Sequence, residues 1–221
     1  MSRTGLKGVL FDLDGTLVDT LEDLSASLNA VLANHGLPRH DAEACKAMVG
    51  RGVGRLVEAA VPEARRDPAF LARLGAEMRA VYGQRLLAAS RPYPGIPALL
   101  GTLRSRGLPS AVLSNKSHDL TTAIVEGIFP GHPFAAVQGE GSALPPKPDP
   151  RGALAICSAM GLAPQEILFM GDSEIDRETA RRAGMPFAAA LWGFRSRAQL
   201  AGTGAVALLP EPASALALLS D

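Results

Sequence analysis

The sequence predicts an α/β fold, a parallel sheet into which an all-helical segment is inserted. The prediction starts from a short apolar run near the N-terminus, which is typical of a buried strand. Residues 19–89 then show only helical patterns, and from about residue 92 helical patterns alternate with apolar runs. Such alternation favours a parallel sheet with right-handed crossovers. We therefore expect a Rossmann-like core of residues 1–18 and 92–221 and a helical cap of residues 19–91.

The first strand is predicted for residues 9–11, and it ends at Asp12. Asp14 follows closely, and Gly15 and Thr16 then break the strand. Carboxylates at the carboxyl end of a buried parallel strand lie where open α/β sheets place their ligands. The alternative is that Asp12 and Asp14 only end a strand or start a turn, because Asp-Gly is a common turn pair.

The cap is predicted from apolar residues at helical spacing. A helix that begins near Leu21 ends at Gly36 and Pro38, since both residues stop helices. The apolar stripes indicate the core of a helical bundle rather than a cofactor site. The other helical patterns cover residues 41–48, residues 53–61 and a longer stretch capped by Asp67.

Beyond the cap, strands and helices are expected in alternation, and we find no internal repeat. A loop rich in glycine and proline covers residues 139–150. The strands are expected at residues 111–113, 134–137, 167–170, 187–191 and 206–209. The helices are expected at residues 96–106, 119–126, 151–160, 175–183 and 196–200, with a short one at the C-terminus.

Two of the polar groups near strand ends have the chemistry to bind a phosphate. Ser114 and Asn115 follow the strand at 111–113, where a hydroxyl and the next backbone amide can hold a phosphate oxygen, although such a pair also caps helices. Lys147 lies in the proline-rich loop just before a helix. The prolines stiffen this loop and so aim the lysine, which is otherwise an ordinary surface residue.

A further pair of acids follows the strand at 167–170. Asp172 and Asp176 can both face a cation at this position. The alternative is that Asp172 or Ser173 caps the next helix, because Asp and Ser are preferred at that position.

Composition excludes several other classes of protein. The 221 residues are 47% hydrophobic, enough for a core domain with an inserted subdomain. The net charge is +0 and basic pairs are isolated, so no nucleic acid is expected as a partner. Cys45 and Cys157 form no disulfide framework, and the four histidines lack zinc spacing. Without a targeting signal or an apolar span, we expect a soluble, cytoplasmic protein and no membrane partner.

Taken in order, the motifs resemble those of the haloacid dehalogenase-like hydrolases. An acid pair within Asp-x-Asp-Gly-Thr-Leu, a hydroxyl, a lysine and a final acid stand at or near strand ends, and the match spans essentially the whole chain. The position of the cap resembles the subfamily with a helical cap. Within it, residues 48–52, 171–176 and 191–194 resemble phosphoglycolate phosphatases, although phosphatases of sugar phosphates, pyrophosphate or biosynthetic intermediates share much of this pattern.

The resemblance implies a mechanism in which Asp12 is the nucleophile and Asp14 the general acid and base. Phosphoryl transfer needs neutralisation of the phosphate oxygens, and Mg²⁺ suits an all-oxygen site. The phosphoryl oxygens are then expected on Ser114, Asn115 and Lys147, and Mg²⁺ on Asp12, the backbone carbonyl of Asp14 and Asp172, with Asp176 acting through a water.

The expected reaction is hydrolysis of a small phosphorylated partner, 2-phosphoglycolate, through an aspartyl-phosphate, by a monomer or homodimer. A phosphatase of another substrate or a phosphomutase remains an alternative. A dehalogenase on the same fold would need neither Asp14 nor Mg²⁺. A phospho-accepting receiver module, the alternative that is not an enzyme, would be about half this length.

One loop of the cap suggests a contact with the substrate. Gly50, Gly52 and Gly54 surround Arg51, and such glycines allow a tight turn and close backbone approach. If the loop covers Asp12 when the cap closes, Arg51 is a candidate to bind a substrate carboxylate through its guanidinium. The alternative is a plain connector between helices with an exposed arginine.

Overall fold

The computed structural model describes residues 5–141, 143–202 and 204–219. Its main sheet has six strands in the order β5-β4-β1-β6-β7-β8, and every neighbouring pair is parallel. The predicted parallel sheet is therefore confirmed. The strands are β1 (Gly8–Phe11), β4 (Ser110–Ser117), β5 (Val137–Glu140), β6 (Ile167–Gly171), β7 (Phe187–Ala190) and β8 (Ala207–Leu209).

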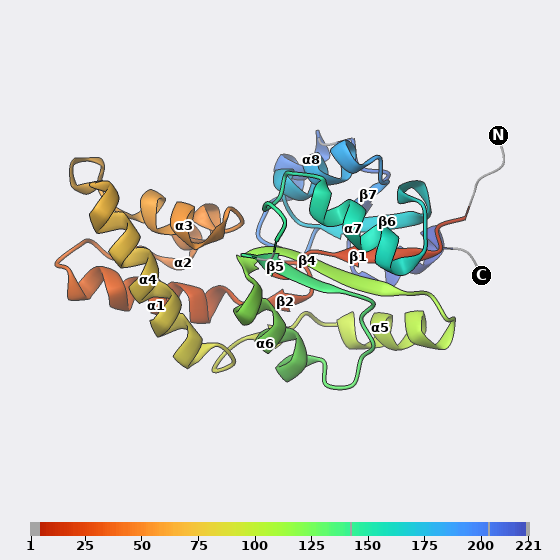
Figure 1. Cartoon of the computed structure of the whole chain (residues 1–221), viewed down its shortest axis with the longest axis horizontal. Coiled ribbons are helices and arrows are strands. Elements are labelled where there is room, and N and C mark those ends of the chain that lie inside the picture. The colour runs from red at the N-terminus through yellow and green to blue at the C-terminus, as the bar shows by residue number, and fades with distance from the viewer. Residues whose placement is uncertain (1–4, 142, 203, 220–221) are drawn as a thin grey trace.

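The central strand, β1, is buried on both faces of the sheet. Its side chains alternate between two apolar clusters, with Val9 and Phe11 in one and Leu10 in the other. This explains why the strand reads as a continuous apolar run. Figure 1 shows helices on both faces: α5 (Ile96–Ser105) and α6 (His118–Ile128) on one, α7 (Arg151–Met160) and α8 (Glu174–Ala183) on the other.

Four helices follow β1 in the sequence and precede the other strands of the main sheet. They lie together at one end of the molecule, on the left in Figure 1. Asp67 caps the longest of them, as the sequence predicts, because its carboxylate accepts a hydrogen bond from the Phe70 N–H at 2.9 Å. Their apolar side chains belong to the same core cluster as Val9 and Phe11. We call them the cap helices: α1 (Leu21–Asn34), α2 (Ala42–Met48), α3 (Gly52–Ala60) and α4 (Pro68–Arg85).

A two-stranded antiparallel ribbon joins the cap helices to the sheet. β2 (Val18–Asp19) pairs with β3 (Arg91–Pro92). Asp23, in the first turn of α1, is buried and accepts hydrogen bonds from the backbone N–H groups of Ala89 and Ser90 at 2.9 and 2.7 Å. The sequence predicts neither short strand, because a two-residue strand has no periodicity to detect.

Strand β5 starts later than the sequence predicts. The expected strand at 134–137 contains Phe134, whose ring instead packs edge-on against Phe129 and His132. The strand itself continues through polar residues to Glu140, because an edge strand is only half buried. The Ala135 N–H still donates to the Ser110 carbonyl at 2.8 Å, and the Ala136 carbonyl accepts from the Val112 N–H at 2.9 Å, so these residues lead into the strand.

The last elements are short. Ser196 caps α9 (Arg197–Ala201), and the C-terminal helix is of the 3₁₀ type, Pro212–Leu218. Across residues 5–141, 143–202 and 204–219, no helix combines the length and the apolar composition that crossing a membrane requires.

Candidate active site

The carboxyl edge of the sheet brings the predicted site residues together. Asp12 follows β1 directly and Asp172 follows β6, so neighbouring parallel strands deliver two carboxylates to one place. Ser114 and Asn115 lie on the adjacent strand, β4, which continues to Ser117 instead of ending at residue 113. All four side chains are buried.

Lys147 joins Asp12 to Asp176. Its Nζ lies 2.7 Å from Asp12 Oδ1 and 2.6 Å from Asp176 Oδ1, and its side chain is only 2% exposed. Burial by itself lowers the pKa of a lysine, but the two carboxylates raise that of Lys147 above its usual range. The lysine is therefore a fixed cation beside Asp12 and not an ordinary surface residue.

Asp176 has both oxygens engaged within the protein. Oδ1 accepts from Lys147, while Oδ2 accepts from the N–H and the hydroxyl of Ser173 at 3.1 and 2.5 Å. Ser173 in turn caps α8, which bears out the capping alternative for this residue. The arrangement makes Asp176 the group that positions Lys147.

Asp172 is enclosed by two glycine-containing loops. Its Oδ2 accepts a hydrogen bond from the Phe194 N–H at 2.5 Å. A β-carbon at Gly15, whose φ is +84°, or at Gly193 would overlap the Asp172 side chain. Glycine at these positions is therefore required for the two loops to close around this carboxylate.

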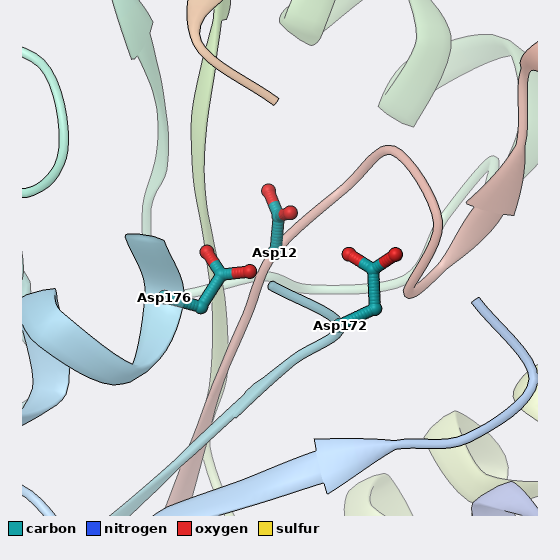
Figure 2. A group of neighbouring side chains, drawn as sticks. All are labelled: Asp12, Asp172 and Asp176. Atoms are coloured by element: carbon teal, nitrogen blue, oxygen red, sulfur yellow. The ribbon is translucent and has the colours of Figure 1, made fainter. Parts of the chain in front are cut away.

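Figure 2 shows the carboxylates of Asp12, Asp172 and Asp176 gathered around one space. One oxygen from each lies within 4.8 Å of the others. Burial and the nearby Asp176 raise the pKa of Asp12 to about 7, against the attraction of Lys147. Burial, followed by the charges of Asp12 and Asp176, raises the pKa of Asp172 well above its usual range. The cluster thus holds more negative charge than the described side chains neutralise.

This chemistry fits a divalent cation. Asp12 Oδ2 and Asp172 Oδ1 accept no hydrogen bond from any residue that the structure describes, whereas their partner oxygens do. With Asp14, the site has four carboxylates against the two ammonium groups of Lys116 and Lys147, an excess of two negative charges. Two carboxylate oxygens without a hydrogen bond, together with this charge excess, are suitable for a hard cation with oxygen ligands.

Asp14 does not belong to this cluster of three carboxylates and contacts a second lysine. Asp14 Oδ1 accepts from the Thr20 hydroxyl at 2.6 Å and lies 2.9 Å from Lys116 Nζ. Lys116 Nζ also donates to the Tyr82 hydroxyl at 2.9 Å, so it connects the sheet to cap helix α4. Burial alone would lower the pKa of Lys116, but Asp14 and Tyr82 raise it.

Sequence reasoning missed Lys116. The predicted strand stopped at residue 113, which left Lys116 in a loop, and surface loops commonly carry lysine. The signal that was available is its position two residues after Ser114, within a stretch already assigned to phosphate binding.

Ser114 and Asn115 differ in how free they are. The Ser114 hydroxyl accepts from the Lys116 N–H at 3.1 Å and remains at the cavity wall. The Asn115 side chain is engaged: its Oδ1 accepts from the Lys147 N–H at 2.7 Å, and its amide donates to the carbonyls of Lys147 and Gly50 at 3.0 and 3.2 Å. Asn115 therefore links the loop that carries Lys147 to the loop at Gly50, between α2 and α3.

Arg51 is not brought to Asp12. Its side chain is 64% exposed and contacts Glu174 at 3.4 Å, on the outer side of the boundary between the cap helices and the sheet. Gly50 and Gly52, the residues on either side, do line the cavity above Asp12. Gly52 has φ +80°, and its close approach to the Asn115 carbonyl leaves no room for a side chain.

A cavity of about 60 Å³ lies above Asp12 and Asp14, between the sheet edge and the cap helices. Its polar wall comes from β4, with Ser114, Asn115 and Lys116. Arg79 and Tyr82 of α4 also line it. Its apolar walls are Leu24, Val49, Val53, Leu56, Met78 and Leu120.

Comparison with known proteins agrees with this geometry. A model of the haloacid dehalogenase-like hydrolase family matches residues 9–190. The phosphoglycolate phosphatase of Rhodospirillum rubrum is 38% identical over 94% of this chain and 88% of its own length. The N-acetylmuramic acid 6-phosphate phosphatase of Pseudomonas aeruginosa is 35% identical, with 88% and 85% covered.

The fold also matches a solved structure. A protein from Lactobacillus delbrueckii subsp. bulgaricus aligns with a TM-score of 0.90 at 31% identity, over 98% of this chain and all of that one. The family match covers both the sheet strands that carry the acids and the cap helices between them. The chain therefore belongs to the haloacid dehalogenase-like hydrolase family.

Proposed function

We propose that this protein is a Mg²⁺-dependent phosphatase that hydrolyses 2-phosphoglycolate to glycolate and phosphate through an aspartyl-phosphate. The observation that carries the proposal is the arrangement around Asp12: Lys147 contacts one of its oxygens, an oxygen of Asp172 lies within 4.8 Å of an Asp12 oxygen, and Asp14 lines the same cavity. Relatives that bear the name phosphoglycolate phosphatase support the choice of substrate.

The reaction proceeds in two transfers. The Asp12 carboxylate attacks phosphorus, and the bond from phosphorus to the glycolate oxygen breaks as Asp14 donates a proton to that oxygen. Asp14 then takes a proton from water, whose oxygen attacks the same phosphorus and releases phosphate from Asp12. Lys147 and Ser114 bind the phosphoryl oxygens during both transfers, and Asp176 keeps Lys147 in place.

Asp12, the backbone carbonyl of Asp14 and Asp172 would hold the Mg²⁺. When bound, the cation neutralises charge on the phosphoryl group, so that an anionic carboxylate can approach it. Mg²⁺ is our choice because every candidate ligand is an oxygen and few come from the protein.

The size of the cavity favours a short substrate. A space of about 60 Å³ suits the two-carbon acid of phosphoglycolate better than a hexose ring while the cap helices stay in this position. An amino-sugar phosphate, named for the Pseudomonas aeruginosa relative, would require the cap helices to move away.

The test is phosphate release by the purified protein, first stripped with chelator and then supplied with Mg²⁺. We expect turnover of 2-phosphoglycolate that Mg²⁺ restores, and slower turnover of N-acetylmuramic acid 6-phosphate. Asp12→Asn should lower kcat at least about 1,000-fold, whereas Asp149→Asn, an exposed carboxylate near Lys147, should not.

A different experimental result would contradict each part of the proposal: the metal, the nucleophile and the substrate. Activity that survives exhaustive chelation contradicts the metal. Steady-state turnover by Asp12→Asn contradicts the nucleophile. If phosphoglycolate stays intact while other phosphorylated metabolites are hydrolysed, the substrate is wrong and the phosphatase assignment stands.

We also propose that residues 19–91 act as a cap on a core of residues 1–18 and 92–221, and that the enzyme works in the cytoplasm as a monomer or homodimer. The β2–β3 ribbon, where the chain enters and leaves the cap helices, supports this division. Sedimentation of the purified protein and fractionation of cells test the oligomeric state and the location.

A further inference from the structure

The cavity has a cationic side that the proposed transfers of phosphate do not use. Lys147 serves the phosphoryl side of Asp12, whereas Lys116 contacts Asp14 at 2.9 Å. In the proposed reaction Asp14 faces the oxygen of the leaving group. Lys116 is therefore next to the space that the rest of the leaving group occupies.

Lys116 has a hydrogen-bond donor to spare. An ammonium group carries three N–H donors. The carboxylate of Asp14 and the hydroxyl of Tyr82 take two of them, and no other acceptor is found among the residues that the structure describes. The side chain is only 6% exposed and lines the cavity, so a third acceptor has to enter through the cavity.

A second cation reaches the same space from the cap helices. Arg79 lies one turn before Tyr82 on α4, and both line the cavity. Within the described part of the chain, Arg79 makes no hydrogen bond or ion pair. Arg73, two turns earlier than Tyr82, instead lies 5.3 Å from the centre of the Phe70 ring. The positive charge of Arg79 also acts on Asp119, but no hydrogen bond among the described residues takes up its guanidinium, which leaves its donors available to an anion in the cavity.

The remaining walls are apolar apart from Ser117 and offer few partners to a polyhydroxylated group. Six apolar side chains of the cap helices and of α6 face the cavity. Hydroxyl groups placed against them would lose hydrogen bonds to water without replacement, which costs free energy. A short leaving group whose polar atoms are concentrated in one anion suits this lining better.

We propose that Lys116 and Arg79 bind a carboxylate on the leaving group, so that the site selects phosphate esters of short hydroxy acids. This inference rests on the proposed function, and it replaces Arg51 as the reader of the carboxylate. Two-point binding by the buried Lys116 and the exposed Arg79 also couples the substrate to helix α4, because Tyr82 and Arg79 belong to that helix.

The experiment compares 2-phosphoglycolate with 2-phosphoglycolamide, which keeps the scissile bond and the size but lacks the charge. The measured quantity is the ratio of kcat/KM for the acid to that for the amide. Wild type should favour the acid by about 100-fold, since the neutral analogue leaves the third donor of the buried Lys116 and the guanidinium of Arg79 without an anion. Lys116→Met should lower this ratio at least about 10-fold, and Arg79→Gln about 3- to 10-fold.

A substitution of Lys116 can also disturb Asp14 and so slow both substrates. Such a general loss of activity cancels, because the readout is the ratio of the two kcat/KM values. Arg85→Gln, an exposed arginine on the same helix outside the cavity, is the matched control and should keep the wild-type ratio. Arg79→Gln provides a surface variant in case Lys116→Met does not fold. If wild type does not distinguish acid from amide, or if both substitutions leave the ratio unchanged, the inference is overturned. If wild type hydrolyses neither compound, the choice of phosphoglycolate in the proposed function fails.

Discussion

At the scale of single residues, the site depends on one ammonium group held between two buried carboxylates. Lys147 contacts Asp12 and Asp176 at nearly equal distances, 2.7 and 2.6 Å. Removing one partner of such a buried arrangement leaves the other charge uncompensated, which is costly. We therefore expect Asp176 to affect the reaction through the position of Lys147.

Asp176→Asn should lower kcat about 10- to 100-fold at saturating Mg²⁺. The amide keeps the shape and an acceptor for Ser173 but removes the charge that holds Lys147. The Mg²⁺ concentration for half-maximal activity should change little, since both Asp176 oxygens are already engaged in the protein. Kinetics over a Mg²⁺ titration measure both quantities, with Asp149→Asn as the control. A large rise in the Mg²⁺ requirement would show that Asp176 is a direct ligand instead.

At the scale of elements, the loop after β7 contacts three parts of the site. The Trp192 indole N–H donates to the Thr16 carbonyl at 3.0 Å, and the Phe194 N–H donates to Asp172. Arg195 then donates to the carbonyls of Lys46 and Val49 at 3.0 and 2.8 Å. These carbonyls lie at the C-terminal end of α2, where helices lack internal donors and where a cation is favourable.

Arg195→Met should weaken the closure of the cap helices over the site. The side chain is only 10% exposed, and methionine keeps the apolar contact while removing both hydrogen bonds to α2. We expect kcat/KM to fall at least about 10-fold, mostly through KM, because a single hydrogen bond to a charged group contributes about 1.5–3 kcal/mol and about 1.4 kcal/mol is a factor of ten. Amide hydrogen exchange in residues 42–50 should become faster.

The control for this substitution is Arg197→Met, an exposed arginine at the start of α9. It should leave both kcat/KM and hydrogen exchange unchanged. If Arg195→Met has wild-type KM and exchange, the contact with α2 does not hold the cap helices.

At this scale, some residues of the site could be predicted from the sequence, and others are revealed only by the structure. Acids that follow apolar runs, such as Asp12 and Asp172, could be predicted because parallel strands place their carboxyl ends at one edge. The place of Lys116 in the site could not, because only the pairing of Ser117 with Glu140 of β5 reveals that β4 continues past residue 113. The direction of Arg51 was also beyond the sequence, since a residue at the start of a helix points wherever the packing of that helix sends it.

At the scale of the whole molecule, the interior charges are balanced only together with a cation. Four carboxylates and two lysines meet between the sheet and the cap helices, in a space that water barely enters. Metal-free protein compensates by keeping protons: the pKa of Asp12 is raised to about 7 from an ordinary value of 3.8, chiefly by burial, and that of Asp172 is raised in the same direction. The free energy of unfolding must therefore depend on pH.

For an acid whose pKa is raised by folding, the folded state binds a proton that the unfolded state has released. The resulting stability is present in full below pH about 4 and is lost as pH rises through about 7. Metal-free protein should thus lose a few kcal/mol of unfolding free energy between pH 5 and pH 8, as each pKa unit is worth about 1.4 kcal/mol. Mg²⁺ binds the ionised carboxylates, so the increase in Tm that it causes should grow over the same interval.

Thermal unfolding from pH 5 to pH 8, with chelator or with Mg²⁺, measures this dependence. Asp172→Asn should flatten the metal-free profile and abolish the Mg²⁺-induced increase in Tm, because it removes both a titrating group and a candidate ligand. Asp149→Asn should keep both effects, since the exposed Asp149 pairs with Arg151 and its pKa is lowered to about 2, below the interval tested. If metal-free protein is equally stable at pH 5 and pH 8 while Mg²⁺ raises Tm by the same amount at both, the carboxylates are ionised without the cation. Lys116 and Lys147 then suffice to neutralise the site.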